Sequence, residues 1–283
     1  MAFWDKISSR GNVEDRRGMS PIALGGGGLG LAGVAIVLLF NILGGGVDPN
    51  ALNGILNQLQ QTQGAQQQRN ADEFKGADSY ETFASTVLGS NNDLWRDIFK
   101  QSGKTYAEPK LVLFRGATQS GCGLATAQVG PHYCPADNTI YLDETFFDEL
   151  KNRFGAQGGD VAEAYVIAHE VAHHVQNELG IMDEVHSAQQ SGSDEANALS
   201  IRLELQADCF AGVWAYSVSH LGVFQPGEIN EAIDAASAVG DDRIQEKVQG
   251  QVSPETWTHG SSKQRVDAFN KGFTTGKPAS CSS

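Results

Sequence analysis

The chain has 283 residues, of which 34 are acidic and 20 basic, so its net charge is −14 at pH 7. A chain of this length can form one large domain or two small ones. A surface this acidic repels phosphate backbones, which argues against nucleic acid as a partner.

The first element in chain order is an apolar segment without charged side chains, residues 22–43. Its 22 residues include six glycines, and about 20 apolar residues are enough to cross a bilayer as a helix. Four Lys or Arg side chains precede the segment and the next one is Arg69, so the positive-inside rule predicts a cytoplasmic segment 1–21 and an extracytoplasmic remainder. We therefore expect a single-pass membrane protein with the lipid bilayer as partner of the helix at 22–43. The alternative is a cleaved signal peptide, with 44–46 as its small-residue cleavage region.

Residues 44–71 have the composition of a linker, and residues 72–283 that of a globular domain. Seven of the twelve residues at 57–68 are glutamine, so this part has no apolar core of its own. In the domain, apolar periodicity predicts a mainly helical α+β fold with a small sheet before the two long helices at 160–180 and 194–219. The predicted helices are 79–100, 145–154, 160–180, 194–219, 228–239 and 262–273, and the predicted strands are 111–114 and 139–142.

The helix at 160–180 has clear end signals. Asp160 can cap its start, with Glu163 at the capping-box position. Gly180 is a typical stop signal. A helix with defined ends gives its side chains fixed relative positions.

An HExxH motif lies at the centre of this helix. His169 and His173 are four residues apart, so both lie on one helix face with Cβ atoms about 5–6 Å apart. That spacing allows both imidazoles to bind one Zn²⁺. Glu170 lies one residue round the turn, where it can reach a water on the metal without occupying a coordination position. The alternative is a helix with two hydrogen-bonded histidines and a surface glutamate.

A catalytic zinc site needs a third protein ligand and keeps the fourth position open. Glu204 and Asp208, on the predicted helix 194–219, again lie four residues apart on one face. We predict that Glu204 is the third ligand and that Asp208 holds a ligand histidine through its other ring nitrogen. The alternative, a solvated face, conflicts with the apolar flanks: Ile201, Leu203, Leu205, Ala207, Phe210 and Trp214.

Other histidines are weaker candidates for the third ligand. His174 points about 100° away from His173 on the same helix. His186 and His220 lie near predicted helix ends in polar surroundings, and His132 lies in a predicted loop. All four are expected outside the metal site.

HExxH followed by ExxxD resembles the gluzincin branch of zinc metallopeptidases. More specifically, nearly the whole chain resembles the putative neutral zinc metallopeptidase family of bacteria. The stretches that carry this resemblance are AYVIAHEVAHHVQ (164–176), RLELQADCFAG (202–212), THGSSKQR (258–265), SGCG (120–123) and YCPAD (133–137). The resemblance implies a zincin-like domain with one Zn²⁺ per chain, anchored in the bacterial inner membrane with the domain on the periplasmic or extracytoplasmic side.

Metallopeptidases of this type often use a further His or Tyr to stabilise the oxyanion. His259, just before the predicted helix 262–273, is the candidate for this role, and the alternative is a polar loop histidine. Arg265, on that helix, is interpreted as the ion-pair partner of a buried carboxylate.

The four cysteines allow two disulfides. Cys122 and Cys134 are separated by eleven residues in a Gly- and Pro-containing segment, and in an oxidising compartment we expect them to pair. Cys209 and Cys281 would form the remaining pair. The alternative for these two is free thiols, with Cys209 buried in the core.

Together these features predict a zinc metallopeptidase, most simply an endopeptidase, that acts on a peptide or protein substrate. Zinc held by His169, His173 and Glu204 would activate a water, with Glu170 as general base. The strand at 139–142 is expected to be a sheet edge that holds the substrate extended. One alternative is a non-catalytic, zinc-stabilised scaffold of the cell envelope, and another is hydrolysis of a non-peptide amide.

Overall fold

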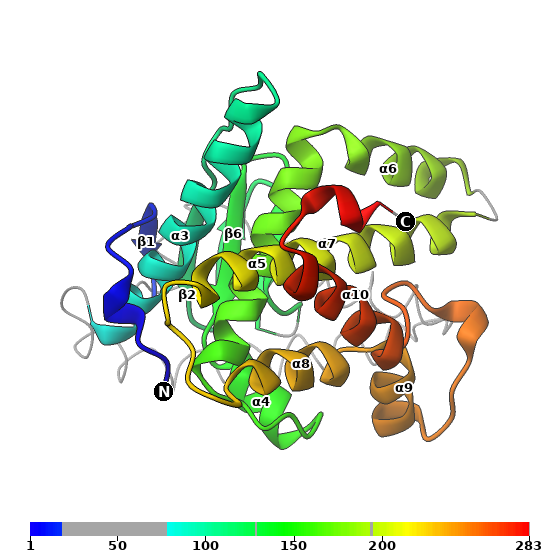
Figure 1. The fold of residues 1–283 in the computed structure, drawn as a ribbon. Coiled ribbons are helices and arrows are strands. Elements are labelled where there is room, and N and C mark those ends of the chain that lie inside the picture. The colour runs from blue at the N-terminus through cyan, green and yellow to red at the C-terminus, as the bar shows by residue number, and fades with distance from the viewer. Residues whose placement is uncertain (19–77, 128, 193–194, 283) are drawn as a thin grey trace.

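The computed structural model describes residues 1–18, 78–127, 129–192 and 195–282 (Figure 1). The two predicted strands form the centre of a four-stranded sheet, in which β2 (Lys110–Phe114) runs parallel to β6 (Thr139–Asp143). β1 (Val13–Asp15) extends the sheet parallel to β2, and β5 (His132–Cys134) extends it antiparallel to β6. The order β1-β2-β6-β5 makes β6 an internal strand, so the expectation of a sheet edge at 139–142 is wrong, and the edge strand on this side is β5.

Side chains of β2 and β6 alternate between two apolar layers, as the pleat of a strand requires. Leu111, Leu113, Ile140 and Leu142 belong to the main core. Val112, Phe114 and Tyr141 form a smaller cluster with Ala125 and Cys134. Ala125 comes from a hairpin of β3 (Ala117–Ser120) and β4 (Gly123–Thr126). Apolar cover on both faces explains why these strands have nearly continuous apolar runs.

The predicted helices are present, and two further helices join them. The structure contains α3 (Ser79–Gln101), α4 (Phe146–Asn152), α5 (Asp160–Glu178), α6 (Ile181–Ser191), α7 (Ala196–Ser219), α8 (Ile229–Ala238), α9 (Asp241–Gln249) and α10 (Ser262–Thr275). The additional helices are α6 and α9. Both are short and polar, so neither has the long apolar stripe by which a helix is recognised in a sequence.

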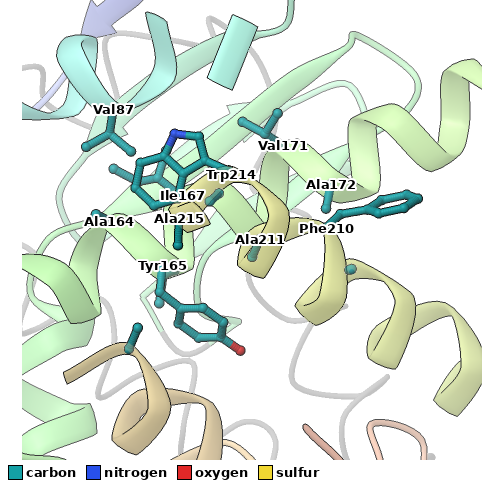
Figure 2. Packing of buried hydrophobic residues seen from close by; sticks show 14 of the residues in the cluster. Val87, Ala164, Tyr165, Ile167, Val171, Ala172, Phe210, Ala211, Trp214 and Ala215 are labelled. Carbon is teal, nitrogen blue, oxygen red and sulfur yellow. The ribbon is translucent and has the colours of Figure 1, made fainter. Parts of the chain in front are cut away.

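α5 lies in the middle of the domain, with α3, α7 and α8 packed around it (Figure 1). α5 and α7 carry buried alanines at four-residue spacing: Ala164, Ala168 and Ala172 on the first, and Ala207, Ala211 and Ala215 on the second. Small side chains at this spacing allow helices to approach closely. Larger side chains, such as Ile167 and Trp214, fill the space around them (Figure 2).

α7 and α10 touch through their backbones. A Cβ atom added at Gly212 would lie 2.1 Å from the carbonyl oxygen of Phe269, and one added at Gly272 would lie 1.9 Å from that of Cys209. Only glycine fits at such positions, so the two glycines fix the distance between the helices.

Residues 1–17 are packed against the domain. Besides forming β1, this segment contacts the start of α5, where the Trp4 indole and the Ala2 backbone N–H donate hydrogen bonds of 2.7 and 2.9 Å to Asp160. The Ile7 side chain is buried in the main core. The N-terminal segment is thus part of the domain's structure.

Arg17 ends this segment in a buried ion-pair cluster. Its side chain is 1% exposed, and its guanidinium lies 2.7 Å from Asp15, 2.7 Å from Glu144 and 3.0 Å from Asp78. Three carboxylates from distant parts of the sequence surround one cation. This arrangement joins the first described residues to those that follow position 77.

These contacts correct the predicted topology. Residues 1–17, expected across a bilayer from the domain, supply one strand of its sheet. Within the described ranges, none of the helices combines the length and the apolar character needed to cross a bilayer. The longest two, α3 and α7, each carry several charged side chains. The predicted transmembrane helix at 22–43 and the linker at 44–71 lie outside the described residues. The transmembrane helix and the single-pass localisation are therefore not supported, and the fold is a mainly helical domain with small sheets.

The start of α5 also differs from the predicted capping box. The N-cap residue is Gly159, with a φ of 113°, and no side chain caps the helix. Asp160 lies in the first turn, where its carboxylate accepts the hydrogen bonds from Trp4 and Ala2. The carboxylate binds a residue 156 positions away in sequence, and no local sequence pattern could indicate this hydrogen bond.

Glu163, in the same turn, has an unusual pKa. Burial raises the pKa of its carboxyl to about 7, and the nearby carboxylates of Asp160, Glu144 and Asp148 act in the same direction, while the Tyr80 hydroxyl opposes them. Because the folded-state pKa lies above that of the unfolded chain, folding favours the protonated form.

We therefore expect Glu163 to make the protein less stable as pH rises. Its contribution is fully present below about pH 4.5 and is lost as pH rises through about 7. Glu163→Gln should leave the free energy of unfolding nearly unchanged at pH 4.5 and raise it by roughly 3 kcal/mol at pH 8. Urea unfolding across this range measures the difference. Glu149→Gln, an exposed carboxylate on α4, controls for the loss of one charge, and equal profiles for the two variants would contradict the expectation.

Candidate metal centre

α5 and α7 bring His169, His173 and Glu204 together. The two imidazole rings have centroids 4.7 Å apart. Glu204 reaches both of them, with one carboxylate oxygen 3.2 Å from His169 Nε2 and the other 3.3 Å from His173 Nε2. One ligand atom from each of the three residues lies within 4.8 Å of the other two. The ligand set predicted from the two motifs is therefore one cluster in space.

The donor atoms of this cluster fit a zinc ion. Two imidazole nitrogens and a carboxylate oxygen form a ligand set that zinc enzymes use. With bonds of about 2.0–2.1 Å in a tetrahedral arrangement, neighbouring ligand atoms are about 3.3 Å apart. Each carboxylate oxygen of Glu204 lies near this distance from one histidine nitrogen, at 3.2 Å from His169 and 3.3 Å from His173. His169, His173 and Glu204 could hold the ion with little movement.

Asp208 lies behind His169. Its carboxylate accepts a 2.9 Å hydrogen bond from His169 Nδ1, a 2.5 Å bond from the Tyr165 hydroxyl and a 2.8 Å bond from Arg265 Nε. Asp208 is completely buried. Arg265 is thus the partner of a buried carboxylate, as predicted, and Asp208 directs His169 Nε2 toward Glu204.

The carboxylates also set the charge of the metal-free site. Burial opposes a charged imidazole at His169, but Asp208 and Glu204 outweigh it and raise the pKa of His169 to about 10. Burial likewise disfavours a charged Glu204, but His173 and His169 hold its pKa well below the usual range. A divalent cation would find an anionic ligand in place, and its binding would release the proton from His169.

A cavity of about 450 Å³ opens over this cluster. Glu170 lines it beside the two histidines. His132 and Tyr133 of β5 and the residues just before this strand also line it. Most of the remaining wall is apolar and comes from several elements: Val129, Phe146, Val166, Met182, Leu203, Val239 and Ile244. The cavity thus combines one polar cluster with apolar surroundings and a sheet edge.

His259 lines the same cavity from the loop before α10. Its Nδ1 lies 3.1 Å from Asp241, and this hydrogen bond raises the pKa of His259. The other oxygen of Asp241 accepts backbone N–H bonds from Thr258, His259 and Gly260 at 2.8, 2.7 and 3.0 Å. Asp241 therefore holds both the loop and the imidazole. Asp241 could not be recognised from the sequence, because it lies 18 residues before His259 in a polar helix without a motif.

The other histidines have different positions. His174 is buried on another face of α5, with Nε2 2.6 Å from the carbonyl of Ala107. His132, expected in a loop outside the site, lies on β5 and lines the cavity. His186 and His220 are absent from the cavity lining. None of the four joins the cluster that could hold a metal.

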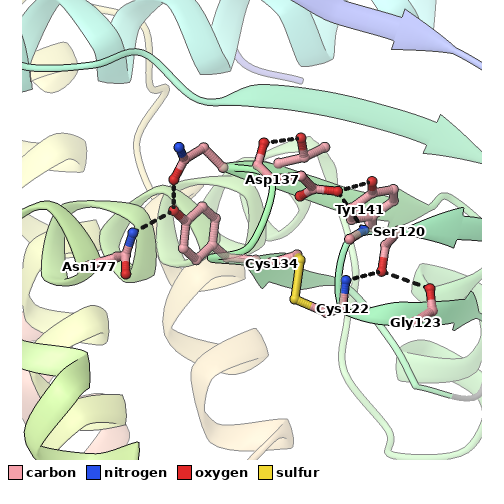
Figure 3. The surroundings of a disulfide bond; sticks show 11 residues. Ser120, Cys122, Gly123, Cys134, Asp137, Tyr141 and Asn177 are labelled. Atoms are coloured by element: carbon pink, nitrogen blue, oxygen red, sulfur yellow. Dashed lines mark hydrogen bonds between the residues drawn. A yellow bond between two sulfur atoms is a disulfide. The ribbon is translucent and has the colours of Figure 1, made fainter.

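Both predicted disulfides are present. Cys122–Cys134 ties β5, the edge strand at the cavity, to the turn between β3 and β4 (Figure 3). Cys209–Cys281 joins α7, one residue after Asp208, to the turn that follows α10. The alternative of two free thiols at the second pair is therefore wrong.

Comparison with known proteins identifies relatives and a family of this chain. The uncharacterized protein YpfJ of Escherichia coli K12 is 45% identical over 285 residues, which cover 98% of this chain and 97% of that protein. The uncharacterized protein Rv2575 of Mycobacterium tuberculosis H37Rv is 43% identical over 216 residues, or 73% of this chain and 72% of that protein. No solved structure gives a significant match. The family model described as putative neutral zinc metallopeptidase matches residues 2–283, and the chain belongs to this family.

Proposed function

We propose that this protein is a zinc-dependent endopeptidase. The observation that carries the proposal is the convergence of His169, His173 and Glu204 at the spacing of a zinc site, with Glu170 beside them on the wall of a cavity. A purely structural zinc site is closed by four protein ligands, whereas a catalytic site has three and an open position. Three donors and an adjacent carboxylate favour catalysis over the alternative of a zinc-stabilised scaffold.

Two residues of the chain have roles in the proposed mechanism. Zinc, when bound, supplies a Lewis acid and lowers the pKa of a water ligand toward about 7. Glu170 accepts a proton from the attacking water and delivers it to the leaving amine. His259, held by Asp241 and with a raised pKa, donates a hydrogen bond to the oxyanion.

The cavity walls support an extended peptide with apolar side chains as substrate. β5 is an edge strand, and an extended peptide can add to such an edge through backbone hydrogen bonds. The apolar wall, including Phe146, Met182 and Ile244, would receive a side chain next to the scissile bond. The strand proposed to hold the substrate is therefore β5, residues 132–134, in place of the internal strand at 139–142.

Digestion of a peptide library, with and without a chelator, tests this function. We expect cleavage within peptides blocked at both ends, preferentially beside a large apolar residue, and loss of cleavage with the chelator. Restoration by stoichiometric Zn²⁺ would identify the metal. Cleavage only from free termini would contradict an endopeptidase. A zinc-loaded protein that cleaves no peptide, but hydrolyses a small amide, would favour the alternative of non-peptide amide hydrolysis.

A further inference from the structure

The two ligand histidines are held by chemically different partners. Asp208, a carboxylate, accepts the Nδ1 hydrogen bond of His169, whereas the neutral amide of Gln176 lies beside His173. The distance from Gln176 Oε1 to His173 Nδ1 is 2.9 Å. Gln176 is completely buried between α5 and α7. Gln176 lies one turn after His173 and ends the stretch 164–176 that carries the family resemblance, but the sequence alone assigned it no role.

The amide of Gln176 has only one favourable orientation. Its Nε2 donates to the backbone carbonyl of Leu203 at 2.8 Å and to Gln206 Oε1 at 2.9 Å. A backbone carbonyl can only accept, so the NH₂ group must face Leu203. Rotating the amide by 180° would place two acceptors against each other and leave buried groups unpaired, at a cost of about 1–3 kcal/mol for each. The Oε1 atom of Gln176 must therefore face His173.

An acceptor at this position determines which nitrogen of His173 carries a proton. Nδ1 donates to Gln176, and a ring whose single proton is on Nδ1 has its lone pair on Nε2. His173 Nε2 is the atom that faces Glu204, at 3.3 Å. Leu203 immediately precedes Glu204. One turn of α7 therefore provides the third ligand, Glu204, and also orients the Gln176 amide, which in turn orients the second ligand, His173.

We infer that Gln176 is a positioning residue of the metal centre. It sets the tautomer and ring orientation of His173 and takes its own orientation from the carbonyl of Leu203. This inference rests on the proposed zinc site. Partners that orient a ligand histidine in this way typically contribute about 10–100-fold in metal affinity.

Zinc affinity of three variants tests the inference, measured by competition with a chelator of known affinity. Gln176→Met fills a similar space but offers Nδ1 no oxygen acceptor, and we expect a zinc Kd about 10–100-fold higher than wild type. Gln176→Glu retains an oxygen at the acceptor position but loses the NH₂ group that donates to Leu203, so it should recover only part of the affinity. Gln206→Leu is the matched control, because it removes a partner of the amide but keeps the carbonyl of Leu203. It should bind zinc nearly as well as wild type.

Nitrogen-15 NMR of the zinc-loaded proteins provides a second readout that packing alone would not change. The His173 Nδ1 proton should give a downfield, slowly exchanging resonance in wild type and Gln206→Leu, and should lose it in Gln176→Met. Unchanged affinity and an unchanged resonance in Gln176→Met would overturn the inference while leaving the zinc site intact. Equal loss of affinity in Gln206→Leu would overturn it in favour of helix packing. Absence of zinc binding by wild type would overturn the proposed function itself, and this inference with it.

Discussion

Glu170→Gln is expected to lower peptidase turnover by about 10²–10⁴-fold, with zinc content and melting temperature near those of wild type. Glutamine preserves the size of the side chain but cannot accept a proton. Glu170 lines the cavity and is not one of the three residues whose donor atoms converge, so its replacement should not release the metal. The measurement is kcat on the best peptide of the library, with zinc determined by mass spectrometry of the same sample.

Two further variants serve as controls for Glu170→Gln. Glu178→Gln changes a carboxylate at the end of α5 that does not line the cavity, and it should behave like wild type. His259→Ala should retain zinc and lose turnover to a smaller extent than Glu170→Gln. If wild type is fully loaded with zinc, and Glu170→Gln is unchanged in every peptide and amide assay, the protein is a zinc-stabilised scaffold.

Arg17→Met is expected to lower the free energy of unfolding by about 3–5 kcal/mol. The Arg17 guanidinium is almost fully buried and lies against Asp15, Asp78 and Glu144. Removal of the cation leaves three carboxylates close together, of which Glu144 keeps its ion pair with Arg115. Urea unfolding at neutral pH, followed by circular dichroism, measures the change.

Arg96→Met is the matched control for this change. The Arg96 side chain is 49% exposed and pairs with Asp93 and Glu108 at the surface. Exposed pairs contribute about 0–1 kcal/mol, so this variant should differ little from wild type. A similarly small effect of Arg17→Met would contradict the docking of residues 1–17 onto the domain. The pair of variants therefore also tests the correction of the predicted topology.

The features that could be predicted from the sequence are those with local causes. The long amphipathic helices follow from apolar periodicity, and the clustering of the proposed ligands follows from two motifs whose spacing places side chains on one helix face. The register of α5 fixes His169 and His173, and the register of α7 fixes Glu204 and Asp208. These relations depend only on neighbouring positions along each helix.

The features that escaped prediction depend on distant contacts. β1 has three residues, two of them charged, and becomes a strand only because β2 offers an edge about 100 positions later. Arg17 looks like a surface residue until Asp78 and Glu144 are placed beside it. Asp241 looks like a solvated carboxylate of a polar helix until the loop of His259 folds over it. No window of the sequence contains these pairs of residues.

The docked N-terminal segment imposes an order on folding during synthesis. Residues that are synthesised early bind residues that are synthesised late. The Phe3 N–H donates to the carbonyl of Val223 at 2.8 Å, and the amino group of Met1 lies 2.7 Å from Glu228. At about 5–20 residues per second, the ribosome needs roughly 10–45 s to reach position 223. During that time the Trp4 indole lacks two of the aromatic rings that it packs against, those of Trp214 and Phe224. The segment around Phe3 is thus synthesised well before several of the residues that it contacts, and it reaches its native place late.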